Sequence, residues 1–216
     1  MGEQRGAGSL RWFTEFGPEH SHRYVERFRA LAASGTDVDG EARLVDALLP
    51  RGARVLDGGC GPGRVGAALA ARGHAVTGVD ADGVLIAAAQ ADHPEALWIV
   101  EDLADYATDE PYDAVVLAGN VLVYVAPGTE ATVIAGLVDC LAPGGVFVCG
   151  FATDREYTVA DLDHDAAATG LVLEHRFATW DLRPWHADAG WAVGIFRKPL
   201  QAAPVHWASS PYSSSP

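Results

Sequence analysis

The stretch Arg54-Val55-Leu56-Asp57-Gly58-Gly59-Cys60-Gly61-Pro62-Gly63-Arg64-Val65-Gly66 decides the fold of this 216-residue chain. It predicts a short buried strand that ends on a carboxylate, a turn through glycines and the start of a helix. Glycine accepts positive φ and lets a ligand lie against the backbone, while the first N–H groups of a helix have no partner inside the helix. The stretch is therefore typical of a nucleotide-binding turn.

The spacing of the glycines fits two kinds of nucleotide. Gly61 to Gly66 satisfies the pattern G-x-G-x-x-G, and Asp80 lies nineteen positions after Gly61, as a dinucleotide site requires. However, Asp57 would set a negative charge near the pyrophosphate of a dinucleotide. S-adenosylmethionine has no phosphate and presents a sulfonium, an ammonium and ribose hydroxyls, which a carboxylate favours. Asp57 therefore favours the second cofactor.

The residues from Val55 to Gly63 resemble the first motif of the class I S-adenosylmethionine-dependent methyltransferases. The resemblance implies S-adenosyl-L-methionine as cofactor and S-adenosyl-L-homocysteine as product. It also implies that the glycine-rich turn contacts the cofactor through Asp57, Gly59, Gly61, Gly63 and Arg64.

A second pattern of the sequence sets the fold class. Strand-like runs alternate with helical patterns, which predicts a mostly parallel sheet covered by helices on both faces. The expected strands are 54–57, 75–80, 97–100, 114–118 and 146–151, and the expected helices between them are 63–72, 83–91 and 130–141, with no clear helix between the third and fourth strands. The residues 142–145, Ala-Pro-Gly-Gly, are expected to form a turn before the fifth strand.

The last two expected strands, 171–180 and 191–197, follow a helix near 159–169 and have no room for a crossover helix between them. They should form an antiparallel hairpin. A parallel sheet that ends in such a hairpin is similar to the seven-stranded, Rossmann-like sheet of the class I methyltransferases, and it differs from a dinucleotide fold.

Three further pairs of residues after the expected strands are candidate cofactor ligands. Asp80, followed by Ala81, can accept two hydrogen bonds from a ribose diol, although a carboxylate there can also cap the next helix, a role that Asp82 suits as well. The resemblance implies that Asp102 accepts from the adenine amine, with Leu103 beside the ring. It also implies that the methionine end of the cofactor lies near Ala118 and Asn120.

The candidates for the acceptor side are less specific. Asn120 and Tyr124 can orient the cofactor or the acceptor, or they can serve the loop and the core instead. Amphipathic helices are expected over 19–33 and 39–49. The resemblance implies that the segment from Trp12 to Leu49 forms a lid over the cofactor, in which Arg23, Tyr24 and Arg43 face the cofactor's carboxylate or simply pack. Trp180, Trp185 and His186 are candidates for an acceptor wall.

Composition excludes several function classes. The net charge of −14 argues against a nucleic-acid partner, and no apolar run is long enough for a membrane span. Cys60, Cys140 and Cys149 are too few and too scattered for a disulfide framework, so we expect a cytoplasmic protein. The eight histidines show no metal-site spacing, so no metal is expected, and His20, His22, His175 and His186 are unranked candidates for a general base.

We therefore expect an N-terminal arm and helical lid over residues 1–49, a methyltransferase domain over 50–198 and a Pro- and Ser-rich tail over 199–216, in which Trp207 and Tyr212 are candidate docking side chains. The expected activity is methyl transfer to a small-molecule acceptor by in-line displacement, with no catalytic residue assigned. Two alternatives stay open: an NAD(P)-dependent oxidoreductase, and a non-catalytic protein that binds S-adenosylmethionine.

Overall fold

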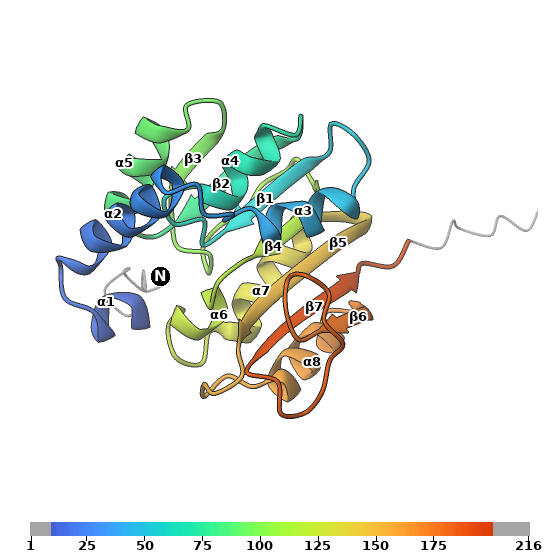
Figure 1. The fold of residues 1–216 in the computed structure, drawn as a ribbon. Coiled ribbons are helices and arrows are strands. Elements are labelled where there is room, and N and C mark those ends of the chain that lie inside the picture. Colours follow the sequence, from blue (N-terminus) through green and yellow to red (C-terminus); the bar gives the residue numbers. More distant parts are fainter. Residues whose placement is uncertain (1–9, 201–216) are drawn as a thin grey trace, which may run out of the picture.

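The fold is built around a seven-stranded sheet with the strand order β3-β2-β1-β4-β5-β7-β6. The computed structural model describes residues 10–200 of the chain (Figure 1). The strands are β1 (Arg54–Gly58), β2 (Ala75–Asp80), β3 (Leu97–Val100), β4 (Tyr112–Leu117), β5 (Leu141–Ala152), β6 (Val172–Phe177) and β7 (Trp191–Arg197). The pairs among β1 to β5 are parallel, and β7 lies antiparallel between β5 and β6.

Helices cover both faces of the sheet (Figure 1). They are α1 (Arg11–Glu15), α2 (His20–Ala33), α3 (Gly40–Ala47), α4 (Arg64–Ala70), α5 (Gly83–Asp92), α6 (Val121–Tyr124), α7 (Glu130–Asp139) and α8 (Val159–Ala168). Among the N-terminal helices, α1 contacts α6, α2 contacts α5 and α3 contacts α4. The N-terminal segment therefore crosses from one part of the sheet to another.

Alternate packing explains why residues 114–117 of β4, which follow Asp113, are all apolar. Val115 and Leu117 pack in the hydrophobic cluster that contains α7 and α8. Ala114 and Val116 pack in the cluster that contains α3 and α4. Because successive side chains of a strand point to opposite faces, a strand covered on both sides must be apolar at every position.

The predicted sheet, with its C-terminal hairpin and the missing helix between β3 and β4, is confirmed. Two short helices, α1 and α6, were not expected. The turn expected at 142–145 lies within the bounds of β5, where the pairing with β4 shifts from Tyr112↔Leu141 to Ala114↔Val146. Gly144, at φ 80°, provides the turn inside this irregularity.

The described part of the N-terminal arm packs on the domain, because Leu10 is buried and Trp12 is half-buried. Residues 201–216, with Trp207 and Tyr212, lie outside the described residues. Within residues 10–200, no helix combines the length and the apolar character that a membrane span requires.

Candidate cofactor site

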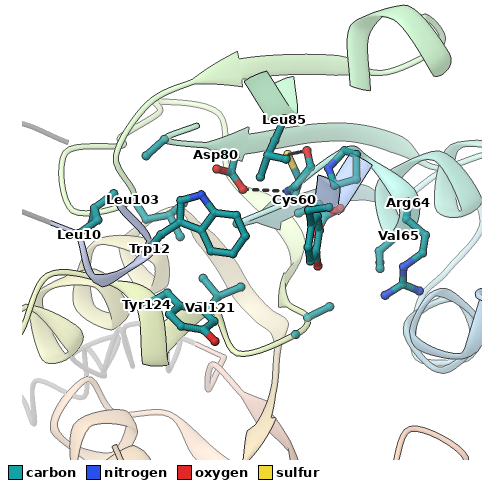
Figure 2. A pocket seen from close by; sticks show the side chains of 18 of the residues that line it. Leu10, Trp12, Cys60, Arg64, Val65, Asp80, Leu85, Leu103, Val121 and Tyr124 are labelled. Atoms are coloured by element: carbon teal, nitrogen blue, oxygen red, sulfur yellow. Dashed lines mark hydrogen bonds between the residues drawn. The ribbon is translucent and has the colours of Figure 1, made fainter. Parts of the chain in front are cut away.

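A cavity of about 890 Å³, open at its mouth, lies where β1, β2, β3 and β4 end (Figure 2). The structure brings most of the predicted cofactor residues together in its lining, namely Asp57, Gly59, Gly61, Arg64, Asp80, Ala81, Asp102, Leu103 and Ala118.

The glycine-rich turn needs its glycines for two reasons. Gly59, Gly61 and Gly63 have φ values of 65°, 56° and 84°, which other residues rarely adopt. A Cβ atom on Gly59 would also lie 2.6 Å from the side chain of Val121. Gly63, which precedes α4, packs against Trp98 and does not line the cavity, so its position supports the turn more than a direct contact with a cofactor.

Asp57 is a buried carboxyl group at the end of β1, with only 1% of its surface exposed. Its Oδ2 accepts a hydrogen bond of 2.8 Å from the backbone N–H of Gly66 in α4. Burial raises the pKa of Asp57 to about 7, and the Gly66 hydrogen bond offsets only part of that shift. A cation placed in the cavity would favour its ionised form.

Asp80 is held in place by the turn that it faces. Its Oδ2 accepts from the N–H of Gly61 at 2.9 Å (Figure 2). Its Oδ1 accepts from the N–H of Asp82, also at 2.9 Å. Each carboxylate oxygen can accept a further hydrogen bond. Burial raises the pKa of Asp80 to about 6. The geometry therefore presents an oriented carboxylate to the cavity, as a ribose diol requires.

Asp82 performs the capping role that was predicted for it. Its Oδ1 accepts from the N–H of Val84 at 2.9 Å and so caps α5. Its Oδ2 accepts from the indole Nε1 of Trp12 at 2.8 Å and from the hydroxyl of Ser21. These last two contacts, which the sequence analysis missed, fix the N-terminal helices to the start of α5.

Arg64 connects the turn to α3. Its guanidinium binds the carboxylate of Glu41 through two hydrogen bonds of 2.8 and 2.6 Å and also donates to the carbonyl of Val38. It stands 5.4 Å from the ring centre of Phe28. Arg64 lines the cavity, but these partners already satisfy most of its donors, and its contact with a cofactor stays a prediction.

The two predicted residues after β3 both line the cavity, and their contact with adenine stays a prediction. Asp102 lines the cavity, and its Oδ1 accepts from the N–H of Ala104 at 3.0 Å, which orients the side chain. Leu103 is buried and forms an apolar part of the lining.

Asn120, a predicted cofactor residue, bonds the backbone of β5 through its side chain. It has φ 65°, and its Oδ1 accepts from the N–H of Ala152 in β5 at 2.8 Å. The side chain thus satisfies a backbone group, which was the alternative left open, and Asn120 is not part of the cavity lining. Its neighbour Ala118 does line the cavity, as does Tyr124 at the end of α6.

Aromatic residues of the N-terminal helices close the cavity on its other side. Trp12, Tyr24 and Phe28 belong to the lining, and the ring of Trp12 lies 5.6 Å from that of Tyr24 and 5.7 Å from that of Tyr124. By contrast, Arg23 and Arg43 are exposed outside the cavity, and Arg43 binds Asp37 at 2.7 Å. Of the three residues predicted to face the cofactor from the lid, only Tyr24 lines the cavity.

The candidates for an acceptor wall on the hairpin side, Trp180, Trp185 and His186, do not line this cavity. Trp180 fills the space above Gly150, where a Cβ atom would lie 2.4 Å from its ring, so it is part of the core. Trp185 and His186 lie on the connection between β6 and β7, outside the cavity. The apolar wall comes instead from Leu10, Trp12, Val121 and Val125, which the sequence analysis did not select.

Of the four histidines that were candidates for a general base, one lies beside the cavity and three are exposed at the surface. His20 stacks on Phe16 at 3.9 Å between ring centres and contacts Trp12, beside the cavity. His22, His175 and His186 are exposed. Among residues 10–200 no three His, Cys, Asp or Glu side chains are grouped so that they could hold a metal ion.

The sheet and the site together define a class of protein: an α/β enzyme that binds a nucleoside cofactor at the carboxyl ends of its parallel strands. The family model described as "Methyltransferase domain" matches residues 55–145. A similar solved structure is the crystal structure of a TehB-like SAM-dependent methyltransferase from Corynebacterium glutamicum. The two sequences are 42% identical, and the structures align with a TM-score of 0.80 over 84% of this chain and 100% of that one.

More distant relatives agree with this match. Trans-aconitate 2-methyltransferase from Variovorax paradoxus is 36% identical over 110 residues, which are 50% of this chain and 42% of that protein. The chain thus spans about two fifths of the length of the curated relatives that it matches. The CcbJ methyltransferase from Streptomyces caelestis shares the fold, at 22% identity and a TM-score of 0.67 over 74% of this chain and 94% of that one.

The chain therefore belongs to the class I S-adenosylmethionine-dependent methyltransferases. Its cofactor is S-adenosylmethionine, and the residues of the cavity fit that molecule: carboxylates for the ribose and the cationic groups, glycines for close approach, and an apolar surface beside Asp102. The oxidoreductase alternative is not supported, because the relatives are methyltransferases and the sheet ends in an antiparallel hairpin.

Proposed function

We propose that this enzyme transfers the methyl group of S-adenosylmethionine to a small-molecule acceptor by in-line displacement. The observation that carries the proposal is the enclosure of the cavity, since side chains of α1 and α2 cover the ends of the strands and leave room for a small ligand. The net charge of −14 supports the same conclusion, because a nucleic-acid acceptor would need a basic approach surface.

In this proposal the two halves of the cofactor are held by different strands. Asp80 accepts from the ribose hydroxyls, and Asp102 and Leu103 contact the adenine. Gly59 and Gly61 let the methionine part lie against the backbone, near the buried carboxyl of Asp57. Ala118 leaves space for the sulfonium at the end of β4. This order follows the sheet from β3 to β4 and points the methyl group toward α6.

The bound cofactor supplies an activated methyl group: an acceptor lone pair forms the new bond to carbon as the C–S bond electrons pass to sulfur, which leaves S-adenosylhomocysteine and a proton for solvent. The chain's own residues position the acceptor about 3 Å from the methyl carbon and exclude water. Positioning of this kind needs no dedicated catalytic side chain unless the acceptor must first lose a proton.

Residues 10–49 serve as the lid of this site, and residues 50–198 form the methyltransferase domain. Asp82 and Glu41 support this docking of the lid, because side chains bond across the boundary: Trp12 and Ser21 donate to Asp82, and Arg64 donates to Glu41. The three cysteines are reduced in the structure and all buried, which is compatible with a cytoplasmic enzyme.

The names of the curated relatives suggest trans-aconitate as a second candidate acceptor. That molecule is a tricarboxylate and requires several cationic partners. Among the described lining residues Arg64 carries the only guanidinium, and Glu41 already binds it. The lining therefore does not favour this acceptor.

The direct test uses the methyl-labelled cofactor. Purified protein is incubated with labelled S-adenosylmethionine and a bacterial extract that ultrafiltration has divided into small-molecule and macromolecular fractions. We expect label only in the small-molecule fraction, and none with Asp80→Ala. Label confined to protein or nucleic acid would overturn the proposal. A chiral methyl group should emerge inverted, as a single displacement requires.

A further inference from the structure

The cavity is divided by charge along the sheet. Asp102 follows β3, Asp80 ends β2 and Asp57 lies near the end of β1, so the ionisable groups lie over these three strands. The other half, over β4 and α6, is lined by Ala118, Gly119, Val121, Tyr124 and Val125 and contains no charged side chain. An acceptor that approaches the methyl group from α6 meets this uncharged half.

No free cation is available for an anionic acceptor among the described lining residues. Arg64 is bound by Glu41 and by the carbonyl of Val38, and the side chains of Arg64 and Glu41 are 20% and 17% exposed. Arg11 lies between the two lining residues Leu10 and Trp12, yet its guanidinium binds Glu130 at 3.2 Å and Glu156 at 3.1 Å. Both arginines are thus committed to other carboxylates.

Tyr124 gives the uncharged half an aromatic surface, which Trp12 and Tyr24 of the N-terminal helices extend toward the glycine-rich turn. The ring of Trp12 meets Tyr124 at 74° and Tyr24 at 87°, so the three rings form an angular wall. In Figure 2 the side chains of Trp12, Tyr124 and Val121 lie around the same space. Ring faces attract flat apolar groups and cations, and they repel anions.

We infer that the methyl acceptor is a neutral or cationic molecule with a flat aromatic body and without a carboxylate or phosphate group. This inference rests on the proposed function, because it assumes that the acceptor is small and enters beside α6. The inference predicts how affinity depends on the charge of the acceptor: a cation should bind at least as well as its neutral analogue, and an anion should bind worst. The acidic half of the cavity acts in the same direction through space.

Three probes that share an indole ring test this order. Tryptamine is cationic, indole-3-ethanol is neutral and indole-3-acetate is anionic. Their dissociation constants are measured by NMR titration on the protein saturated with S-adenosylhomocysteine. We expect tryptamine and indole-3-ethanol to bind about tenfold more tightly than indole-3-acetate, a ratio that corresponds to about 1.4 kcal/mol.

Two variants of Tyr124 test whether the preference against anions depends on the aromatic wall. Tyr124→Phe keeps the ring and should keep the charge order, whereas Tyr124→Leu should weaken tryptamine binding about fivefold or more. Equal or tighter binding of indole-3-acetate overturns the inference, as does a failure of all three probes to bind. A different result, label confined to macromolecules, would overturn the proposed function. The failure of this inference can therefore be distinguished from the failure of the proposed function.

Discussion

The indole of Trp12 and the carboxylate of Asp82 form the hydrogen bond that joins the N-terminal segment to the cofactor site. The Nε1–Oδ2 distance is 2.8 Å, and the other oxygen of Asp82 caps α5. Asp82 lies two residues after Asp80 and donates its own N–H to the carboxylate of Asp80. The position of Trp12 over the cavity is thereby coupled to the expected ribose ligand.

Removing this hydrogen bond should weaken cofactor binding without unfolding the protein. Trp12→Phe keeps an aromatic ring but loses the donor, and we expect affinity for S-adenosylhomocysteine to fall about fivefold, as for one hydrogen bond of about 1 kcal/mol. Trp12→Ala also opens the cavity, so its affinity for S-adenosylhomocysteine should fall further. Calorimetric titration measures both, with Phe13→Ala at the neighbouring exposed position as control. Unchanged affinity in Trp12→Ala would show that the segment is not a lid.

The buried carboxyl of Asp57 should make the stability of the cofactor-free protein depend on pH. Its pKa is about 7 in the folded protein and near its usual value of 3.8 in the unfolded chain. The folded state therefore holds a proton that the unfolded state has lost, and the resulting stabilisation, complete at acidic pH, is lost as the pH rises through about 7. Asp80, with a raised pKa of about 6, acts in the same direction.

We expect the free energy of unfolding to fall between about pH 4 and about pH 7, and Asp57→Asn to reduce this fall by about 2 kcal/mol. Asparagine can still accept from the N–H of Gly66 but has no charge to bury. Urea denaturation at several pH values provides the measurement, and Asp105→Asn, at an exposed position, is the control. An equally steep fall in Asp57→Asn would contradict the assignment.

The ion pair between Arg64 and Glu41 should stabilise the protein more than the exposed pairs do. Glu41→Gln leaves a largely buried guanidinium without its charged partner, and we expect the free energy of unfolding to fall by about 1–3 kcal/mol. Asp37→Asn breaks the pair with Arg43, whose side chains are 53% and 64% exposed, and should have a much smaller effect. Similar losses in the two variants would argue against the connection between α3 and the turn.

The contact between Gly59 and Val121 can be tested by a double-variant cycle. Gly59→Ala places a methyl group 2.6 Å from Val121 and strains a backbone with φ 65°, so we expect a loss of about 1–3 kcal/mol. In a Val121→Ala background the steric part disappears and the loss should be smaller. Equal losses in both backgrounds, measured by thermal or urea unfolding, would mean that Val121 does not limit this position.

Asp57, Asp80 and Asp102 could be selected from sequence because strand ends are local features. Each follows an apolar run, and parallel strands bring their carboxyl ends to one edge of the sheet, so chain order alone places these groups together. The same reasoning located Ala118 at the end of β4. No knowledge of side-chain direction was needed.

Trp12 and Asn120 show what local reasoning misses. The Trp12–Asp82 bond joins residues seventy positions apart and depends on how the N-terminal segment crosses the sheet, which no spacing encodes. Asn120 was predicted to contact a cofactor, but a left-handed φ turns its side chain to β5. The pair Gly119-Asn120 was the available signal, because glycine and asparagine are the residues that favour this conformation.

The most direct test of the central claim is calorimetric titration with S-adenosylmethionine, S-adenosylhomocysteine and NAD, on the wild type, on Asp80→Ala and on Asp105→Ala as the exposed control. The account predicts micromolar binding of the first two ligands to the wild type and the control, loss of about tenfold or more of that affinity in Asp80→Ala, and no binding of NAD. Binding of NAD alone, or unchanged affinity for S-adenosylhomocysteine in Asp80→Ala, would contradict it.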